Sequence, residues 1–91
     1  MNADNKDKGM EEMQFGENLK LAAGQAANLE ELLTSCSTAF GREITARELN
    51  EMVVVPVIEA ANEDARKAMR EGFDAVARKL EEFGAFGQRA A

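Results

Sequence analysis

Residues 40–48 read Phe-Gly-Arg-Glu-Ile-Thr-Ala-Arg-Glu, and this stretch separates two helical segments of the chain. Gly41 stands where a glycine commonly ends a helix in the left-handed conformation. Thr45 and Glu48 have the spacing of a capping box, in which the hydroxyl accepts from a backbone N–H and the glutamate reaches back. Because a helix stop and a helix start lie four residues apart, residues 41–44 are predicted to form a turn between antiparallel helices.

A heptad-like pattern precedes this turn. From Phe15 onward, apolar and small residues recur at alternating intervals of 4 and 3, which is the spacing of an a/d seam on a helix. The seam consists of Phe15, Leu19, Ala22, Ala26, Leu29, Leu33, Cys36 and Phe40. It predicts one continuous helix over about residues 12–40, weakened at its centre by Gly24. The alternative is a new helix that starts at Asn28, since Glu31 follows three residues later.

A similar spacing follows the turn and predicts a second helix over about residues 45–84. The seam of this helix consists of Ile58, Asn62, Ala65, Met69, Phe73, Val76, Leu80 and Phe83. A row of small residues lies beside it, which would let another helix approach closely: Ala61, Ala68, Gly72 and Ala75.

The segment from Met52 to Ile58 interrupts this helical pattern, because it combines three consecutive valines with Pro56. Proline removes a helical hydrogen bond, so one interpretation is a long helix kinked at Pro56. In a second interpretation, a short helix from Thr45 ends near Val53 and another begins with Pro56 as its first residue. The β-branched run also leaves open a strand that forms a two-stranded contact in a dimer.

The predicted fold class is all-α, a helical hairpin or a three-helix unit that is kinked or broken near Pro56. A 39-residue helix would span about 58 Å, which is too long for the interior of a compact 91-residue chain. We therefore expect self-association to complete the core. The expected organisation is a disordered polar lead at residues 1–9, one helical domain at 10–84 and a frayed tail at 85–91. In an antiparallel hairpin, Met10 and Met13 would meet Phe83 and Phe86 at a shared end.

The composition limits the chemistry that the chain can perform. It contains no His, one Cys and one Pro. Imidazole acid–base chemistry, the usual zinc sites and an internal disulfide are therefore excluded. Cys36 lies on the first seam, where a buried thiol behaves as a small inert hydrophobic group. Adjacent glutamates point about 100° apart on a helix and form no ready dyad. We predict no catalytic residue, no metal site and no cofactor.

The acidic side chains are concentrated in one part of the sequence. The net charge is −6, and residues 1–60 hold 11 acidic and 5 basic side chains, whereas residues 61–91 hold 6 of each. The candidate basic face consists of Arg66, Lys67, Arg70, Arg78 and Lys79. We expect Glu63 to pair with Lys67 and Asp74 with Arg78, so this face is predicted to be solvated and salt-bridged instead of binding nucleic acid.

No segment has the roughly 20 apolar residues that a membrane span requires, and no apolar region follows the N-terminal charges. We therefore expect a cytoplasmic protein. The expected partner is a second copy, with a dimer favoured, or another helical protein. Asn62 is predicted either to fix the register of such a dimer or to lie in water at its boundary. The predicted interface consists of Phe15, Leu19, Leu29, Leu33, Phe40, Val53, Val55, Val57, Ile58, Asn62, Met69, Phe73, Val76 and Leu80.

Residues 41–49, Gly-Arg-Glu-Ile-Thr-Ala-Arg-Glu-Leu, resemble the start of the first helix in many helix-turn-helix repressors. The sequence departs from that pattern immediately afterwards, where Met-Val-Val-Val-Pro stands in place of a basic recognition helix. The expected hairpin is also similar in plan to small exported proteins of the WXG type, although their Trp-x-Gly motif is missing. We expect a non-catalytic adaptor, assembly factor or regulator; the alternatives are a nucleic-acid-linked regulator with a dimeric helical core and an acidic inhibitor of a partner with a basic site.

Overall fold

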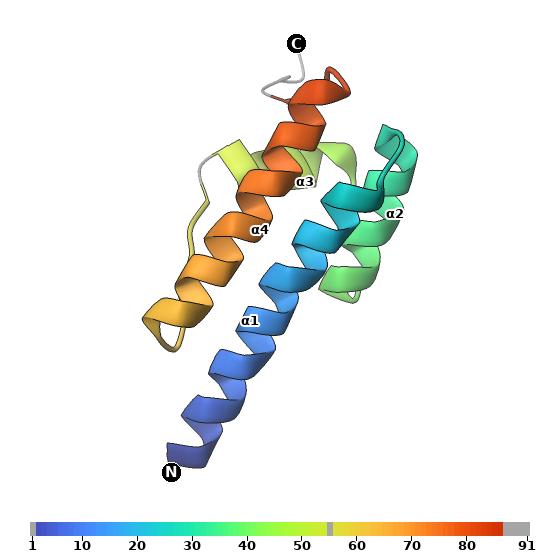
Figure 1. The fold of residues 1–91 in the computed structure, drawn as a ribbon. Helices are drawn as coiled ribbons and strands as arrows, with labels where there is room; N and C mark the ends of the chain where they lie inside the picture. The colour runs from blue at the N-terminus through green and yellow to red at the C-terminus, as the bar shows by residue number, and fades with distance from the viewer. Residues whose placement is uncertain (1, 55, 87–91) are drawn as a thin grey trace.

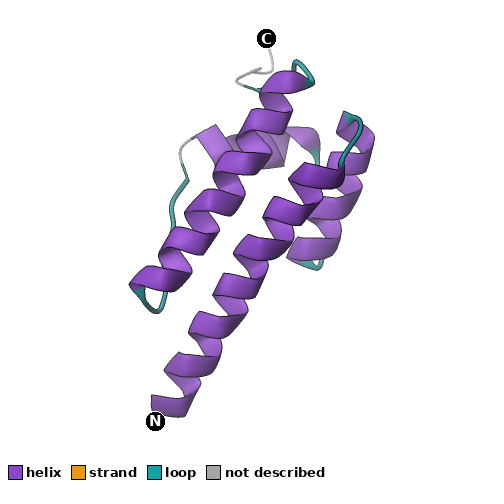
Figure 2. Cartoon of the chain, in the orientation of Figure 1, coloured by secondary structure: helices purple, strands orange, loops and turns teal. Residues whose placement is uncertain are grey.

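The computed structural model describes residues 2–54 and 56–86, with side chains from Lys8 onward. This part of the chain forms four helices and no strand, so the predicted all-α class is confirmed (Figures 1 and 2). The arrangement differs from the hairpin or three-helix unit that we expected. The helices are α1 (Asn2–Gln25), α2 (Leu29–Phe40), α3 (Ala46–Val54) and α4 (Glu63–Glu82).

The prediction of one helix over residues 12–40 is wrong, and the alternative start at Asn28 is confirmed. Asn28 has an extended backbone, and its side chain accepts a hydrogen bond from the Glu31 N–H at 2.9 Å. The Glu31 carboxylate in turn accepts from the Ala27 N–H at 2.9 Å. Because these bonds satisfy donors at the start of α2, the chain can reverse here, and α2 runs back along α1 (Figure 1).

The turn at residues 41–45 has the hydrogen bonds that the sequence predicts. Gly41 has a φ of 77°, and its N–H donates to the Ser37 carbonyl at 2.9 Å. The Thr45 hydroxyl accepts from the Glu48 N–H at 3.1 Å, and the Glu48 carboxylate accepts from the Thr45 N–H at 3.2 Å. The Ser37 hydroxyl also accepts from the Ile44 N–H at 2.8 Å. α3 contacts α4 more extensively than it contacts α2. The helices on the two sides of the turn, α2 and α3, therefore do not form the long antiparallel pair that we predicted.

The predicted helix over residues 45–84 is also interrupted. α3 ends at Val54, residues 56–60 have no regular secondary structure, and α4 begins at Glu63. Proline cannot donate to a helical carbonyl and disfavours a helical residue before it, which accounts for the end of α3. The interpretation with a short first helix is therefore closest, although the next helix begins at Glu63 instead of Pro56.

Helices α1 and α4 run side by side in the same direction (Figure 1). Just before the start of α4, the Ala61 N–H donates to Glu12 in the middle of α1 at 2.8 Å, and further along both helices Lys20 pairs with Glu71 at 3.3 Å. The expected antiparallel arrangement is therefore wrong. As a result, Met10 and Met13 lie towards one end of this helix pair, and Phe83 and Phe86 lie at the other.

Glycine allows α1 and α4 to approach closely. A Cβ atom on Gly72 would lie 2.6 Å from the Gly16 carbonyl oxygen and 3.0 Å from the Leu19 Cβ. A Cβ on Gly16 would overlap the Ala68 carbonyl group. The predicted role of the small residues on α4 is therefore confirmed at Ala68 and Gly72.

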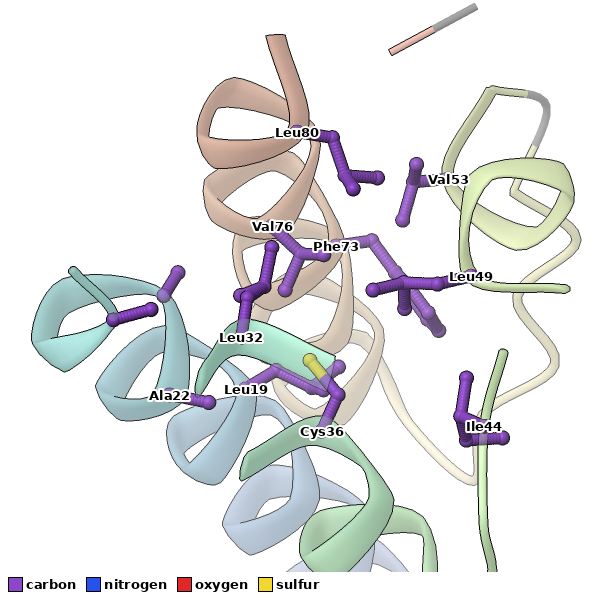
Figure 3. Packing of buried hydrophobic residues seen from close by; sticks show 12 residues of the cluster. Leu19, Ala22, Leu32, Cys36, Ile44, Leu49, Val53, Phe73, Val76 and Leu80 are labelled. Carbon is purple, nitrogen blue, oxygen red and sulfur yellow. The ribbon is translucent and has the colours of Figure 1, made fainter. Parts of the chain in front are cut away.

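The core lies between the four helices (Figure 3). Leu19, Leu32 and Cys36 converge from α1 and α2, while α3 contributes Leu49 and Val53, and α4 contributes the side chains of Phe73, Val76 and Leu80. At one side of this core, the Phe15 ring packs edge-to-face on Phe40, with ring centroids 4.9 Å apart. The core is thus built from side chains of all four helices of one chain.

Residues 2–9, expected as a disordered lead, continue α1 as helix. Ala85 and Phe86, the start of the expected tail, form a turn in which both N–H groups donate to the Leu80 carbonyl at 2.7 and 3.1 Å. Residues 87–91 lie outside the described residues, as does Val55. Among the described helices, none is long and apolar enough to cross a membrane.

Candidate interaction surfaces

The structure places most of the predicted interface residues inside the chain. Five are buried in the core: Leu19, Val53, Phe73, Val76 and Leu80. Six are partly buried: Phe15, Leu29, Leu33, Phe40, Ile58 and Met69. Val57 is 86% exposed, Asn62 is exposed, and Val55 lies outside the described residues. The two seams are therefore largely used to pack this chain against itself. Among the described residues of the predicted interface, only Val57 offers a large exposed apolar side chain.

Asn62 is exposed, in agreement with the predicted place in water, but it does not lie within a helix as both predictions assumed. Its backbone is extended, with φ −155° and ψ 175°, and its side chain accepts from the Ala65 N–H at 2.8 Å. Asn62 is therefore the N-cap of α4 and precedes the helix, whereas we expected it within a helical seam.

Val57 lies at the edge of an open hollow of about 410 Å³, which we name the α3–α4 hollow. Phe73 and Met52 supply its other apolar side chains, from α4 and α3 respectively. The charged lining residues are Arg42, Glu48 and Glu51. The hollow therefore combines an apolar surface with charged side chains at its edge, which is the usual composition of a site that binds an apolar group.

The capping box of α3 fixes one charged edge of the hollow. The Arg42 guanidinium lies 3.1 Å from the Glu48 carboxylate. The hydrogen bond from the Thr45 backbone N–H, followed by that from Arg42, lowers the pKa of the Glu48 carboxyl below its ordinary value. Arg47 pairs with Glu51 at 3.4 Å. The carboxylate of Glu48 is therefore held in its charged form at the edge of the hollow.

The stretch of sequence that supplies most of the lining of the hollow is acidic overall. Residues 42–59 carry two arginines, which both form ion pairs, and four glutamates. Within the described part of the chain, Glu43 and Glu59 form no ion pair. These two carboxylates remain available to a basic group on another molecule.

The predicted basic face of α4 is mixed in charge. Arg78 pairs with Asp74 at 3.2 Å, as predicted. Glu63 lies 4.0 Å from Arg66, which replaces the predicted pair with Lys67. Lys79 pairs with Glu82 at 3.4 Å, and Lys67 and Arg70 are exposed. Acidic side chains thus alternate with the five basic ones, and such exposed pairs contribute little to stability.

A second surface feature has no ionisable side chain at all. An open groove of about 360 Å³ runs between α1 and α2, and we name it the α1–α2 groove. Its lining residues are Asn18, Leu21, Ala22, Gln25, Ser35, Thr38 and Ala39. Leu21 is 57% exposed and is the largest apolar side chain of this lining.

The groove between α1 and α4 provides a contrast, because charged residues line most of it. Its volume is about 390 Å³, and Lys20 pairs with Glu71 within it at 3.3 Å. Asp74, Arg78, Lys79 and Glu82 also line it. The α1–α2 groove therefore differs from the groove between α1 and α4 in its low charge, although Glu30 and Glu31 line an adjoining hollow between α1 and α2.

Sequence periodicity did not single out Leu21, because this residue lies off the seam that contains Leu19 and Ala22. A charge pattern could have identified the surface. No Asp, Glu, Lys or Arg occurs in residues 21–29 or 32–41, although 31% of the chain is charged. Such a gap in two consecutive helices indicates a face that carries few charges.

The side chains with chemical reactivity lie apart from these features. Cys36 is buried, and burial raises the pKa of its thiol to about 11. In residues 2–54 and 56–86, there is no group of three or more His, Cys, Asp or Glu side chains that could hold a metal ion.

Comparison with known proteins gives no match: no family model fits the sequence, and no curated protein or solved structure is significantly similar to the chain. We therefore infer the function from the surfaces described above.

Proposed function

We propose that this chain is a small non-catalytic interaction protein that binds a helical partner protein at the α3–α4 hollow. The observation that carries this proposal is the 86% exposure of Val57 beside a hollow whose apolar surface comes from Phe73 and Met52. Fully burying a valine side chain contributes about 1.5–3 kcal/mol. A partner that covers Val57 and places an apolar side chain in the hollow would gain this free energy.

The charges near the hollow indicate the chemistry of the partner. Glu43 and Glu59 add negative charge that the two local arginines do not neutralise. The partner that fits is a helix whose apolar side chains are flanked by Lys or Arg. Complementary charge of this kind increases the association rate and selects the orientation of binding. An inhibitor that covers a basic site would use the same chemistry, whereas the ion pairs along α4 do not support binding to nucleic acid.

Site-specific crosslinking in the producing cells tests this proposal. A photoreactive amino acid at position 57 should give an adduct with one partner protein, whereas the same group at exposed position 81 should not. The partner should then be purified and its affinity measured by calorimetry. Val57→Asp should weaken binding at least about tenfold, because it removes an apolar contact and places a charged carboxylate against the partner's apolar side chains. Glu81→Lys is the matched control and should leave the affinity within about twofold.

Two results would contradict the proposal. One is the absence of an adduct specific to position 57. The other is a purified partner that binds the wild-type chain and Val57→Asp with equal affinity.

A further inference from the structure

The α1–α2 groove and Leu21 together form a self-complementary surface. The groove has small side chains on both helices, Ala22 on α1 and Ala39 on α2, and these leave room between the helices. Leu21 projects at its edge with 57% of its surface exposed. One face of the molecule thus presents both a protruding apolar side chain and a space for one.

We propose that this face is the contact of a symmetric homodimer, in which Leu21 of each copy enters the α1–α2 groove of the other. A two-fold axis requires a surface that is complementary to itself, because each residue meets its partner's counterpart in the same way. A leucine side chain occupies on the order of 100 Å³, so the groove of about 360 Å³ has room for it.

Electrostatic repulsion between two copies is weakest at this groove. The chain has a net charge of −6, so two copies repel each other over most orientations. The lining of the α1–α2 groove carries no ionisable side chain. Two acidic copies can therefore approach along this groove without burying a charge in it, and Glu30 and Glu31, which line the adjoining hollow, would lie at the periphery of the contact. Interface centres are depleted in charged residues for the same reason.

The polar residues of this face can form hydrogen bonds with the same residues of a second copy. Asn18, Gln25, Ser35 and Thr38 each carry both donor and acceptor atoms, so each can bond to a copy of the same surface. Two of them already make bonds that fix their side chains. Asn18 accepts from Gln14 at 3.1 Å, and the Thr38 hydroxyl donates to the Thr34 carbonyl at 3.2 Å.

The size of the face is compatible with a specific but small interface. α1 from Met10 to Gln25 is about 24 Å long, and two packed helices are about 20 Å wide. The flat footprint is therefore about 500 Å², and the accessible area over the side chains is larger. A standard interface covers about 800 Å² on each partner, which is roughly an eighth of the 6198 Å² surface of this chain. We therefore expect a dimer that dissociates at micromolar concentration.

Sedimentation of the full chain over a range of concentrations, from about 1 to 200 µM, tests the dimer. The wild-type protein should approach twice its mass of 9.9 kDa. Leu21→Asp places a carboxylate in the groove at both symmetry-related sites, so it should weaken the dimer at least about 100-fold. Because Leu21 is exposed in the single chain, the circular dichroism spectrum should not change. Thr38→Arg, on the other side of the groove, should weaken the dimer without altering Leu21.

Val57→Asp serves as the control, since Val57 does not line the α1–α2 groove. This variant should remain dimeric. The proposal of a dimer and the proposal of partner binding at the α3–α4 hollow are therefore tested independently of each other. A wild-type chain that stays at 9.9 kDa at the highest concentration would overturn the dimer. So would a dimer that both Leu21→Asp and Thr38→Arg leave at wild-type strength.

Discussion

Gly16 lies where α1 and α4 come closest, and a methyl group there would require the backbone of one helix to move. Its Cβ would overlap the Ala68 carbonyl group and lie 2.8 Å from the Met69 nitrogen. Gly24 lies in the same helix, but a Cβ there would meet no atom within 4 Å. The two glycines therefore separate the effect of packing from the effect of helix propensity.

We expect Gly16→Ala to lower the free energy of unfolding by about 1–3 kcal/mol, because overpacking outweighs the gain in helix propensity. Gly24→Ala should instead raise it by about 0.5–1 kcal/mol. Urea unfolding followed by circular dichroism measures both values. Equal effects of the two substitutions would contradict the close approach of α1 and α4.

Glu48 should contribute to stability in a pH-dependent way. Its pKa is lowered in the folded chain by the Thr45 N–H and then by Arg42. For a carboxyl whose folded pKa is depressed, the stabilisation is present above the unfolded pKa and is lost as the pH falls through the folded pKa. Glu48→Gln should therefore lower the urea midpoint at about pH 7 and lose most of this difference by about pH 2.

Glu81→Gln is the control for this measurement, because Glu81 is exposed and forms no ion pair in the described part of the chain. It should change the midpoint at about pH 7 less than Glu48→Gln does. A difference between the wild type and Glu48→Gln that stays constant with pH would contradict the role of the ionised carboxylate.

At the scale of the elements, local capping signals predicted the helix boundaries better than apolar periodicity did. Gly41 and the Thr45–Glu48 capping box act through bonds within a few residues, so their positions are visible in the sequence. The 3-and-4 spacing continues through Ala26–Leu29 and Ile58–Asn62, where the structure has no continuous helix. Apolar residues recur there because they pack on the same core from separate elements, and spacing alone cannot distinguish this from one long helix.

The parallel direction of α1 and α4 could not be predicted from either signal. It depends on the path of residues 56–62, which return the chain to the start of α4 beside the first half of α1 (Figure 1). No local residue preference specifies such a path. The small residues on α4 nevertheless predicted that some helix would approach closely, and Gly16 shows which one.

Asn62 provides a test at the level of the element, since it caps α4. Asn62→Ala should lower the free energy of unfolding by about 1 kcal/mol, because the Ala65 N–H loses its acceptor. Asn62→Asp keeps an acceptor at the same position and should retain most of the stability. Thermal unfolding of the two variants provides the measurement. A more stable Asn62→Ala protein would instead support a place within an apolar seam.

At the scale of the whole molecule, we expected an incomplete core because the sequence pattern predicted two long helices. Four shorter helices fold back on one another, so Leu19, Leu49 and Leu80 are fully buried within one chain. Of the predicted interface, Val57 is an exposed apolar residue beside a hollow. The sequence did not identify Leu21 as an exposed apolar residue, because the exposure of a side chain depends on which faces of the helices pack together. The first seam gave no information about the outer side of α1.

The parallel packing of α1 and α4 within one chain determines the arrangement of the other helices. An NMR sample that mixes isotope-labelled and unlabelled protein tests it directly. We predict a strong cross-peak between the Hα protons of Gly16 and Gly72 that is absent from the spectrum filtered for contacts between different copies. Absence of this cross-peak, or its presence only in the filtered spectrum, would contradict parallel packing within one chain. A cross-peak found only in the filtered spectrum would mean that the two seams meet between molecules.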